Sequence, residues 1–413
     1  MKIMVITPYL PHENVGHGGG SAVRDLVKHL ARNHEVLLVS VVRPGENELI
    51  AEVEELGLRV APLAFNDTQA KGTDRLSLMV SRTAALFRSV FSGFPHYVQK
   101  YWMKGLSDQI LDLATKFNPD AIQIEYLQMS LYARDLAKQR LVIDGFNPRI
   151  ILNTHELGSV PRHRRAARAN FPPFQWWFRQ EASRWEHLQV AAGNWVDRLL
   201  CVTEEDRLLY EAMGGTNLLT VPLGMDLEAI KPDRQPTHPP TCLFVGSFNH
   251  RPNVLAADLL IDQIWPKVLA ERPDTRLILA GRGSLDHLEK STGSTAGISA
   301  TGFVEDLTPL FRQSTLFVAP LPEGGGIKIK ILEAMARGIP VITTLVGAEG
   351  ITTEQDDTMV ITDAAHGFAE AIIQALDDPR SEKRALRGRQ LMEEKFGWKA
   401  IAERLAGIYR AEE

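Results

Sequence analysis

The sequence has no long hydrophobic run. Its N-terminal segment, MKIMVITPYLP, contains only four consecutive apolar residues, Ile3 to Ile6, which are too few for a signal peptide. No other run approaches the roughly 18 apolar residues that a membrane-spanning helix needs. We therefore expect any contact with a membrane to be made from its surface.

Cysteine is also scarce. Cys201 and Cys242 both lie in short apolar, strand-like runs, which is typical of buried, reduced thiols. The HExxH and CxxC spacings of zinc sites are absent, so the sequence predicts no metal site. These features predict a cytoplasmic protein, with the inner face of the membrane as the place of any membrane contact.

An excess of positive charge is lacking too. The formal net charge is −5 and the pI is near 6.2, which argues against bulk binding to nucleic acid. The 413 residues suffice for two ordinary domains, each with a large core.

What the sequence does contain is a regular alternation of strand-like runs and amphipathic helical patterns. The strand-like runs of the first half are 2–7, 34–42, 120–125, 149–155, 198–203 and 218–223. The rhythm restarts with TCLFVG and continues through TRLILAG, ISATG, STLFVAP, IPVITT and DTMVIT. Such alternation is typical of parallel sheets covered by helices on both faces. We predict an α/β protein with two doubly wound, Rossmann-like domains facing each other across a cleft.

The domain boundary is predicted from composition. Segment 231–240, KPDRQPTHPP, holds four prolines and no apolar periodicity, so we interpret it as an interdomain linker. This gives an N-terminal, acceptor-side domain over 1–230 and a C-terminal domain over 241–395. The last segment, 396–413, is predicted to be a helix that crosses back to the first domain. Ligands of doubly wound sheets gather at the carboxyl ends of the strands, so the loops there should carry function.

Segment 323–336, EGGGIKIKILEAMA, places glycines and two lysines at the start of an amphipathic helix. The first turn already carries partial positive charge from the helix dipole, so Lys328 and Lys330 there predict an anionic ligand. Glycines let a ligand approach the backbone, and first-turn amides can hold a phosphate. Lys330 and Glu333 share one helical face, which suits a diphosphate and the hydroxyls of a ribose. The alternative is a flexible loop with solvated lysines and Glu333 in a surface ion pair.

Other candidate residues follow other strand-like runs. Arg251 is a second candidate for the phosphate charge, although surface arginines are common near helix starts. His155 ends the run 149–155 and could orient a sugar or phosphate oxygen, although a lone histidine is more often structural. Backbone groups near Phe303 could read the edge of a base. The whole set after these runs is Gly246, Asn249, Arg251, Arg282, Phe303, Val304 and His155.

A second glycine loop, NVGHGGGSAVRDL, lies near the N-terminus. A dinucleotide-binding fingerprint would need glycine at position 21, where the chain has Ser21, and the next run ends without a ribose-binding carboxylate. This argues against an oxidoreductase. We interpret Gly18, Gly19 and Gly20 as a phosphate or acceptor cradle that lines the cleft.

Segment 161–186 is the compositional outlier of the chain. Four arginines are followed by a cluster of aromatic residues: Arg162, Arg164, Arg165, Arg168, Phe171, Phe174, Trp176, Trp177 and Phe178. Two interpretations stay open. The aromatic residues fill the core while the arginines are solvated, or the segment is a peripheral, membrane-facing acceptor platform.

The ordered set of motifs resembles the GT-B fold glycosyltransferases of family 4, also called glycosyl transferases group 1. The resemblance covers nearly the whole chain, through MKIMVITPYLP…GGG, LNTHE, PLGMD, FVGSFNHRPN, LILAGRG, ATGFVEDL and EGGGIKIKILEAMA. The glycine-and-lysine version of the last motif resembles bacterial envelope and exopolysaccharide sugar transferases. Two departures stand out. The E-x7-E pair of the family would place a glutamate at Gly325, whereas Glu323 stands two residues earlier, and Ser247 follows Gly246 where the family has an arginine.

The resemblance implies a retaining, metal-independent hexosyl transfer from a nucleoside diphosphate sugar to a glycan or lipid-linked acceptor, with no separate cofactor. It assigns catalysis to His155, Lys330 and Glu333. Donor binding falls to the glycines and polar residues of both domains, including Glu323, Gly325, Gly326, Ile327 and Lys328. The alternatives are a GT-B relative with another activity, such as an epimerase or a phosphorylase, and a catalytically inactive subunit that binds nucleotide sugar.

Overall fold

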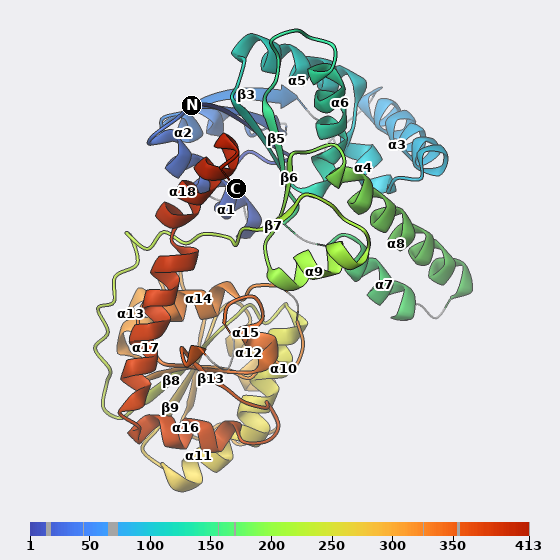
Figure 1. Cartoon of the computed structure of the whole chain (residues 1–413). Coiled ribbons are helices and arrows are strands. Elements are labelled where there is room, and N and C mark those ends of the chain that lie inside the picture. Colours follow the sequence, from blue (N-terminus) through green and yellow to red (C-terminus); the bar gives the residue numbers. More distant parts are fainter. Residues whose placement is uncertain are drawn as a thin grey trace. The chain divides into compact units, whose positions relative to one another are not determined.

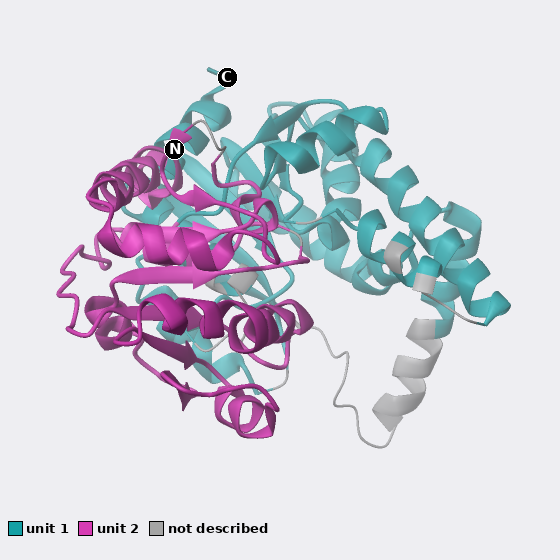
Figure 2. Cartoon of the chain, turned by 90° about the horizontal axis from the view of Figure 1, so that it is seen from below, with its two compact units in different colours: residues 1–224, 401–413 teal, residues 225–400 magenta. Residues whose placement is uncertain are grey.

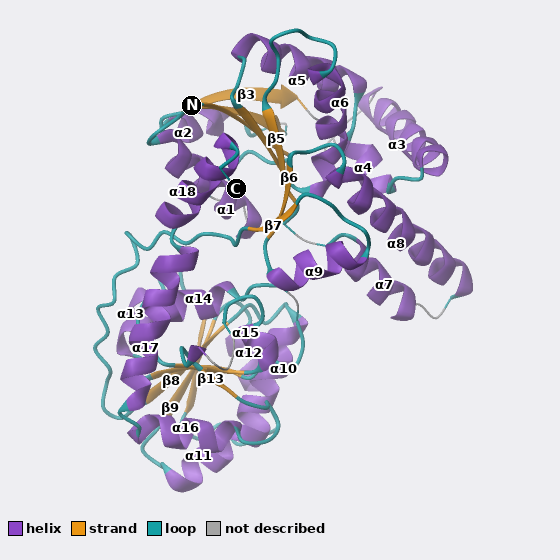
Figure 3. Ribbon diagram, in the orientation of Figure 1, coloured by secondary structure: helices purple, strands orange, loops and turns teal. Residues whose placement is uncertain are grey.

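The computed structural model of the chain describes residues 1–13, 18–43, 45–64, 73–155, 157–168, 171–324, 326–352 and 356–412. The chain divides into two compact units (Figure 2). Unit 1 contains Met1–Gly224 and Ile401–Glu413, and unit 2 contains Met225–Ala400. Each unit is an α/β body of its own, with parallel strands and surrounding helices (Figure 3).

Unit 1 is built on a seven-stranded parallel sheet with the order β3-β2-β1-β4-β5-β6-β7 (Figure 1). Its strands are β1 (Lys2–Thr7), β2 (Glu35–Val42), β3 (Arg59–Ala64), β4 (Ala121–Glu125), β5 (Arg149–Asn153), β6 (Arg198–Cys201) and β7 (Leu218–Thr220). Strands β1 and β2 are buried along nearly their whole length, which explains their nearly continuous apolar sequences.

Helices cover both faces of this sheet. They are α1 (Gly18–Ala31), α2 (Ile50–Glu54), α3 (Thr73–Ser92), α4 (His96–Tyr101), α5 (Lys104–Phe117), α6 (Ser130–Arg140), α7 (Ser159–Arg168), α8 (Pro172–Gly193), α9 (Glu204–Ala212) and the end of α18 (Trp398–Arg410). One apolar cluster joins Ile122 and Ile124 of β4 to buried residues of α4, α5, α6 and α8.

Strand β3 is absent from the sequence prediction because Pro62 interrupts its apolar pattern. Proline lacks the amide hydrogen that a central strand must donate, so its presence usually argues against a strand. In the structure β3 lies at the edge of the sheet, where it pairs only with β2. An edge strand tolerates proline on its unpaired side.

Unit 2 has a six-stranded parallel sheet with the order β10-β9-β8-β11-β12-β13. Its strands are β8 (Thr241–Val245), β9 (Arg276–Ala280), β10 (Ile298–Gly302), β11 (Leu316–Ala319), β12 (Val341–Thr343) and β13 (Val360–Ile361). Its helices are α10 (Arg251–Leu259), α11 (Trp265–Glu271), α12 (Ser284–Lys290), α13 (Thr308–Gln313), α14 (Ile329–Ala336), α15 (Leu345–Ala348), α16 (Phe368–Asp377), α17 (Arg380–Leu391) and the start of α18. Two parallel sheets with helices confirm the predicted α/β, doubly wound class.

The division between the units differs from the predicted one. The sequence places it at the proline-rich segment 231–240, but the structure divides the chain after Gly224. The proline-rich segment belongs to unit 2, where the amides of Gln235 and Thr237 donate to the backbone oxygens of Arg312 and Gln313. Prolines exclude a helix there, yet these two amides still find backbone partners. The terminal helix also begins slightly later than predicted, and its residues from Ile401 onward belong to unit 1.

The order of the strands locates the ligand-binding edge of each sheet. In unit 1 the connections turn in opposite directions from β1 and β4, and in unit 2 from β8 and β11. Doubly wound proteins bind ligands at such switch points, beyond the carboxyl ends of the strands. In unit 2 the relevant loops are 246–250 and 320–328. In unit 1 they follow β1 and β4, with the end of β5 beside them.

Cys201 and Cys242 are buried, free thiols, and burial raises the pKa of each to about 12. Among the described residues, every helix is too short or too polar to cross a lipid bilayer.

Candidate functional site

The centre of the candidate site in unit 2 is Lys330, in the first turn of α14. Its Nζ atom donates a hydrogen bond of 2.5 Å to Oδ1 of Asn253 and lies 4.7 Å from the centre of the Phe244 ring. Burial lowers the pKa of this ammonium to about 7. Among the described residues no carboxylate pairs with it. A buried cation without an anionic partner is costly, which is expected of a residue that receives an anionic ligand.

Asn253 and Gly246 hold Lys330 in place. Asn253 is buried on α10, where its Nδ2 atom donates to the backbone oxygen of Ser247 at 2.9 Å. A Cβ atom on Gly246 would lie only 2.9 Å from Nζ of Lys330 and 2.8 Å from Cγ of Asn253. Position 246 must therefore be glycine for the lysine to reach its amide partner. Asn253 is not among the site residues that the sequence predicts.

Lys328 has a different environment. It precedes α14 and is itself buried, but its Nζ atom donates to Oε2 of Glu349 at 2.9 Å and to the backbone oxygen of Gly326 at 2.5 Å. An ammonium already paired with a carboxylate gains little from a second anion. This arrangement therefore gives no support to the prediction that Lys328 supplies charge to a diphosphate. Its geometry makes Lys328 an anchor for the start of α14.

Two other predicted residues meet across the switch point. Nε of Arg251, the first residue of α10, lies 3.1 Å from Oε1 of Glu323, in the loop after β11. The arginine side chain is 69% exposed, so this ion pair contributes little to stability. An anionic ligand in the crevice could take the guanidinium from Glu323 at little cost.

Glu333 lies one turn after Lys330 and is paired with Arg337. Its Oε1 atom accepts from Nη2 of Arg337 at 3.0 Å and from Nε at 3.3 Å. Arg337 in turn stacks over Phe311, with 5.0 Å between the guanidinium carbon and the ring centre. The alternative in which Glu333 forms an ion pair on the helix therefore holds for one oxygen of its carboxylate. The same pair also fixes the rotamer of the carboxylate, so the ribose role of Glu333 stays a prediction.

Arg282 and Phe303 form a shelf beside these residues. Arg282 follows β9 and Phe303 follows β10, and the guanidinium carbon lies 5.4 Å from the ring centre. Phe303 is 67% exposed, which is unusual for a large aromatic side chain and leaves a face for stacking.

The other predicted residues of unit 2 surround this edge of the sheet. Asn249 is exposed in the loop after β8, and Val304 and Ile327 are half-buried. Gly326 has a φ of +70°, a conformation that favours glycine. Gly325 lies outside the described residues.

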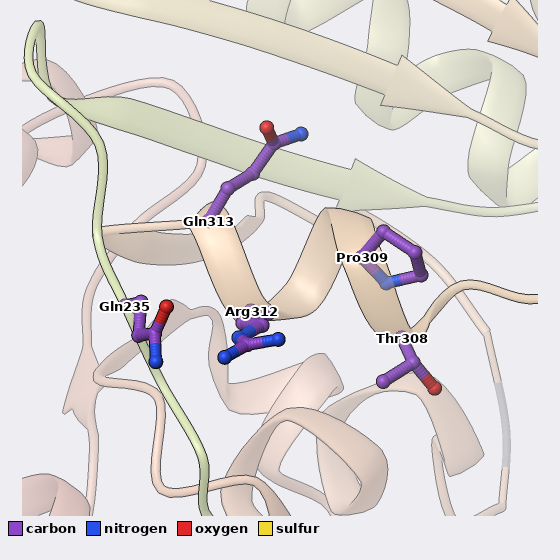
Figure 4. A pocket seen from close by; sticks show the side chains of 5 residues that line it. All are labelled: Gln235, Thr308, Pro309, Arg312 and Gln313. Atoms are coloured by element: carbon purple, nitrogen blue, oxygen red, sulfur yellow. The ribbon is translucent and has the colours of Figure 1, made fainter.

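Unit 2 also has a pocket away from these residues (Figure 4). It has a volume of about 320 Å³ and lies between helix α13 and the proline-rich segment. Its lining residues are Gln235, Thr308, Pro309, Arg312 and Gln313. None of the predicted site residues lines it, so this pocket does not alter the assignment of the candidate site.

In unit 1 the predicted residue His155 lies just beyond the end of β5. Its Nε2 atom is 2.5 Å from Oε2 of Glu125, the last residue of β4, whose side chain is fully buried. The same carboxylate oxygen accepts from Nδ2 of Asn153 at 3.0 Å. The parallel register places Glu125 opposite Asn153, so the strands themselves bring this cluster together. The sequence interpretation did not single out Glu125.

The backbone near His155 is strained. His155 has a φ of +58° and Tyr126 has a φ of +71°, values that cost energy for residues with a side chain. Their rings stack with centres 3.9 Å apart and an interplanar angle of 9°. Strain of this kind usually persists at functional sites. The lone histidine is therefore part of a built arrangement at the ligand-binding edge.

The remaining predictions for unit 1 have mixed outcomes. Helix α1 begins at Gly18, so Gly18, Gly19 and Gly20 lie in its first turn. Their role as a cradle stays a prediction. In the basic and aromatic segment, Trp185 is buried while Phe171, Phe174 and Trp176 are each about 60% exposed. The prediction that the aromatic residues fill the core is therefore wrong for these three. The side chains of Arg164 and Arg168 lie outside the described residues.

The strand order and the two units identify the fold of the chain. Two doubly wound parallel α/β units in one chain match the GT-B fold. A crystal structure of the Anabaena protein HepE in complex with UDP has the same fold over 100% of both chains, with a TM-score of 0.62 and 14% sequence identity.

Sequence comparison identifies one domain. Residues 239–378 match the family described as glycosyl transferases group 1, so unit 2 carries a domain of this family. The chain is 26% identical over 212 residues to a phosphatidyl-myo-inositol mannosyltransferase of Mycolicibacterium smegmatis. The aligned region covers 49% of this chain and 54% of that protein. It is 29% identical over 192 residues to a lipopolysaccharide core biosynthesis mannosyltransferase of Rhizobium meliloti, covering 42% and 52%. The chain thus spans about half the length of these relatives.

Proposed function

We propose that the protein is a glycosyltransferase that moves a sugar from a nucleoside diphosphate sugar to an acceptor in cell-envelope or exopolysaccharide synthesis. The observation that carries this proposal is Lys330, a buried ammonium at the start of a helix with no carboxylate partner among the described residues. It lies at the ligand-binding edge of a group 1 glycosyltransferase domain. The mannosyltransferase relatives, whose names refer to phosphatidyl-myo-inositol and to lipopolysaccharide core biosynthesis, support the proposed pathway class.

In the proposed reaction the bond between the anomeric carbon and the diphosphate breaks, and a bond to an acceptor hydroxyl oxygen forms as that hydroxyl loses its proton. Lys330 and Arg251 stabilise the negative charge that develops on the leaving diphosphate. Glu333 accepts hydrogen bonds from the ribose hydroxyls, and His155 contacts the donor sugar. By resemblance to family 4, the transfer retains the anomeric configuration and needs no metal ion.

The shelf formed by Arg282 and Phe303 is assigned to the nucleobase. An exposed aromatic ring backed by a guanidinium offers a stacking surface. The structural neighbour HepE was crystallised with UDP, whereas two of the mannosyltransferase relatives are named as GDP-mannose-dependent. Both UDP- and GDP-sugars therefore belong in the first donor screen.

The test combines ligand binding and turnover. We expect one class of nucleoside diphosphate sugar to raise the melting temperature of the wild-type protein, because a ligand that binds only the folded state stabilises it. Lys330→Met should lower the affinity by about tenfold to 150-fold, the effect of one charge-assisted contact. Lys267→Met, at an exposed lysine of α11, is the matched control and should bind normally.

Turnover separates the alternatives. Release of the nucleoside diphosphate, accelerated by an acceptor extract, supports transfer. Tight binding without any release would support a catalytically inactive subunit instead. Unchanged affinity in Lys330→Met would contradict the assignment of the site.

We also propose that unit 1 contacts the membrane peripherally through segment 161–186, so that a lipid-linked acceptor is within reach. From residue 157 to residue 180 the chain has five arginines and no acidic residue, although its net charge is −5. Phe171, Phe174 and Trp176 are exposed on the first turns of α8, where aromatic side chains could enter the interface of an anionic bilayer.

Liposome co-sedimentation tests this contact. Binding to anionic vesicles is expected at low salt, and it should weaken at high salt and in the Arg162/Arg164/Arg165/Arg168→Ala variant. Phe174→Ser with Trp176→Ser should weaken it at every salt concentration. The matched control is Leu208→Ser with Leu209→Ser, which changes two exposed apolar residues of α9. Binding that is indifferent to salt and to all these substitutions would leave a water-soluble acceptor as the better proposal.

A further inference from the structure

A buried chain of hydrogen bonds runs from the C-terminal helix to His155 within unit 1. The hydroxyl of Tyr409, on α18, donates to Oε1 of Gln123. Nε2 of Gln123 donates to Oε1 of Glu125 at 2.5 Å. The second oxygen of Glu125 accepts from Nε2 of His155 at 2.5 Å.

The location of these hydrogen bonds is unusual. Gln123 and Glu125 are fully buried in β4, the strand beside the switch point. Side chains two residues apart point to the same face of a strand. The other face carries Ile122 and Ile124, which pack into the apolar cluster of unit 1. A parallel strand covered on both sides is normally apolar throughout, so two polar side chains on one face need an explanation.

The burial of Glu125 makes every donor around it important. A carboxylate with no exposure to water is tolerated only when it is paired and hydrogen-bonded. Here Glu125 accepts a hydrogen bond from Gln123 on one oxygen and hydrogen bonds from Asn153 and His155 on the other. Gln123 can donate with its Nε2 atom only while its amide keeps this orientation. Tyr409 fixes that orientation by donating to the oxygen of the same amide.

We propose that Tyr409, through Gln123 and Glu125, is a positioning residue that sets the tautomer and ring orientation of His155. Glu125 accepts from a proton-bearing Nε2, so Nδ1 is the ring nitrogen that can itself accept a hydrogen bond. The hydrogen bond that one ring nitrogen makes determines the role of the other. The stack of His155 on Tyr126 holds the ring plane. The hydrogen bonds from Tyr409 through Gln123 to Glu125, which we call the relay, determine which ring nitrogen carries the proton.

The prediction concerns the ring-nitrogen chemical shifts of His155 in selectively labelled full-length protein, with the signals assigned by a His155→Gln variant. In the wild type, one tautomer with a protonated Nε2 is expected. In Tyr409→Phe, which removes only the hydroxyl, the two nitrogen signals should move toward each other as both tautomers become populated. Gln123→Met should have the same effect, because it removes the amide that donates to Glu125.

Tyr132→Phe is the matched control. This buried tyrosine of the same unit donates to the backbone oxygen of Tyr101 at 2.7 Å and takes no part in the relay. It should lose a similar amount of stability while the His155 signals stay in place. Unchanged His155 signals in both Tyr409→Phe and Gln123→Met would overturn the proposal.

The role of the relay in turnover rests on the proposed glycosyl transfer, whereas the chemical shifts do not. With a functional donor, Tyr409→Phe should lower kcat by about tenfold, the lower end of what ligand-orienting partners contribute. The donor affinity should change much less than kcat, because the proposed diphosphate contact, Lys330, belongs to unit 2. Shifted His155 signals in a protein that transfers no sugar would uphold the relay and reject the proposed function. A normal kcat together with shifted signals would reject the catalytic role of the relay.

Discussion

At the scale of single residues, Lys330 is the most informative side chain. Its pKa of about 7, caused by burial, means that about half of the molecules carry a neutral amine at neutral pH. A bound diphosphate favours the charged form and so raises this pKa. Ligand binding should therefore take up protons from solution.

We expect nucleoside diphosphate binding to take up about half a proton at pH 7 and nearly one proton at pH 8, and almost none at pH 5.5. The measurement is calorimetry of binding in two buffers with different enthalpies of ionisation. Lys330→Met should abolish the buffer dependence that arises from this group. An uptake that persists unchanged in the variant would assign the proton to another group.

The same shift has a consequence for stability without ligand. The folded-state pKa of Lys330 lies below its unfolded value of about 10.5, so the unfolded chain binds more protons between these two pH values. The contribution of Lys330 to stability is therefore least favourable below pH 7 and becomes more favourable as the pH rises toward 10.5. Lys330→Met should flatten this part of the stability curve.

At the scale of elements, helix α14 shows how two lysines in one short segment can serve opposite purposes. Lys330 lacks a carboxylate partner among the described residues, whereas Lys328 is paired with Glu349, the residue directly after α15. This pair ties the start of α14 to a neighbouring helix. The N-terminal amides that the ligand would meet are thereby fixed before any ligand arrives.

Lys328→Met should therefore destabilise the protein by about 1–3 kcal/mol, the cost of leaving a charge-assisted partner unpaired. Nucleotide affinity should change less than threefold, or about 0.6 kcal/mol. Denaturant unfolding and calorimetric binding measure the two effects, with Lys330→Met as the opposite case: weak binding and equal or higher stability. A large loss of nucleotide affinity in Lys328→Met would return this lysine to the ligand site.

The elements also show what sequence reasoning could and could not reach. Buried strands are recognisable because helices cover both faces and the sequence becomes continuously apolar, as in β8 and β11. The amphipathic pattern of segment 327–335 predicts a buried face of Ile327, Ile331, Leu332 and Met335. The last three are buried in α14, whereas Ile327 precedes the helix and is half-buried. These signals are local, so a single window of sequence contains them.

The partners of the functional side chains could not be predicted in this way. Asn253 lies 77 residues from Lys330, and Glu125 lies 30 residues from His155. Only the strand order brings them together, and one sequence does not specify that order. Gln123 and Glu125 did leave a signal, since polar residues at alternate positions of an apolar strand violate its pattern. The exposure of Phe174 and Trp176 left no signal in the sequence, because aromatic residues are as common in cores as at interfaces.

At the scale of the whole molecule, the two units differ in what should stabilise them. The proposed nucleotide site belongs to unit 2, while the end of α18 contributes Leu405, Ile408 and Tyr409 to the buried part of unit 1. Each large apolar side chain removed from water contributes about 1.5–3 kcal/mol. Deleting 401–413 should therefore destabilise unit 1 by several kcal/mol and leave unit 2 nearly unchanged.

Scanning calorimetry of the truncated chain should show two transitions. The lower one, from unit 1, should be insensitive to nucleotide, and the upper one should rise when nucleotide is added. The full-length chain is the control, and there both transitions should lie at higher or equal temperatures. A nucleotide that raises the lower transition alone would place the ligand in unit 1.

The return of the last residues to unit 1 also orders events during synthesis. A ribosome makes the chain from its N-terminus, so Met1–Gly224 emerges first, yet it lacks part of its buried surface until Ile401–Glu413 has been made. Unit 2 is complete earlier, although its synthesis starts later. Unit 1 can close over Tyr409 only after the whole of unit 2 has been made. A chain interrupted at Ala400 would therefore carry a complete unit 2 and an unfinished unit 1.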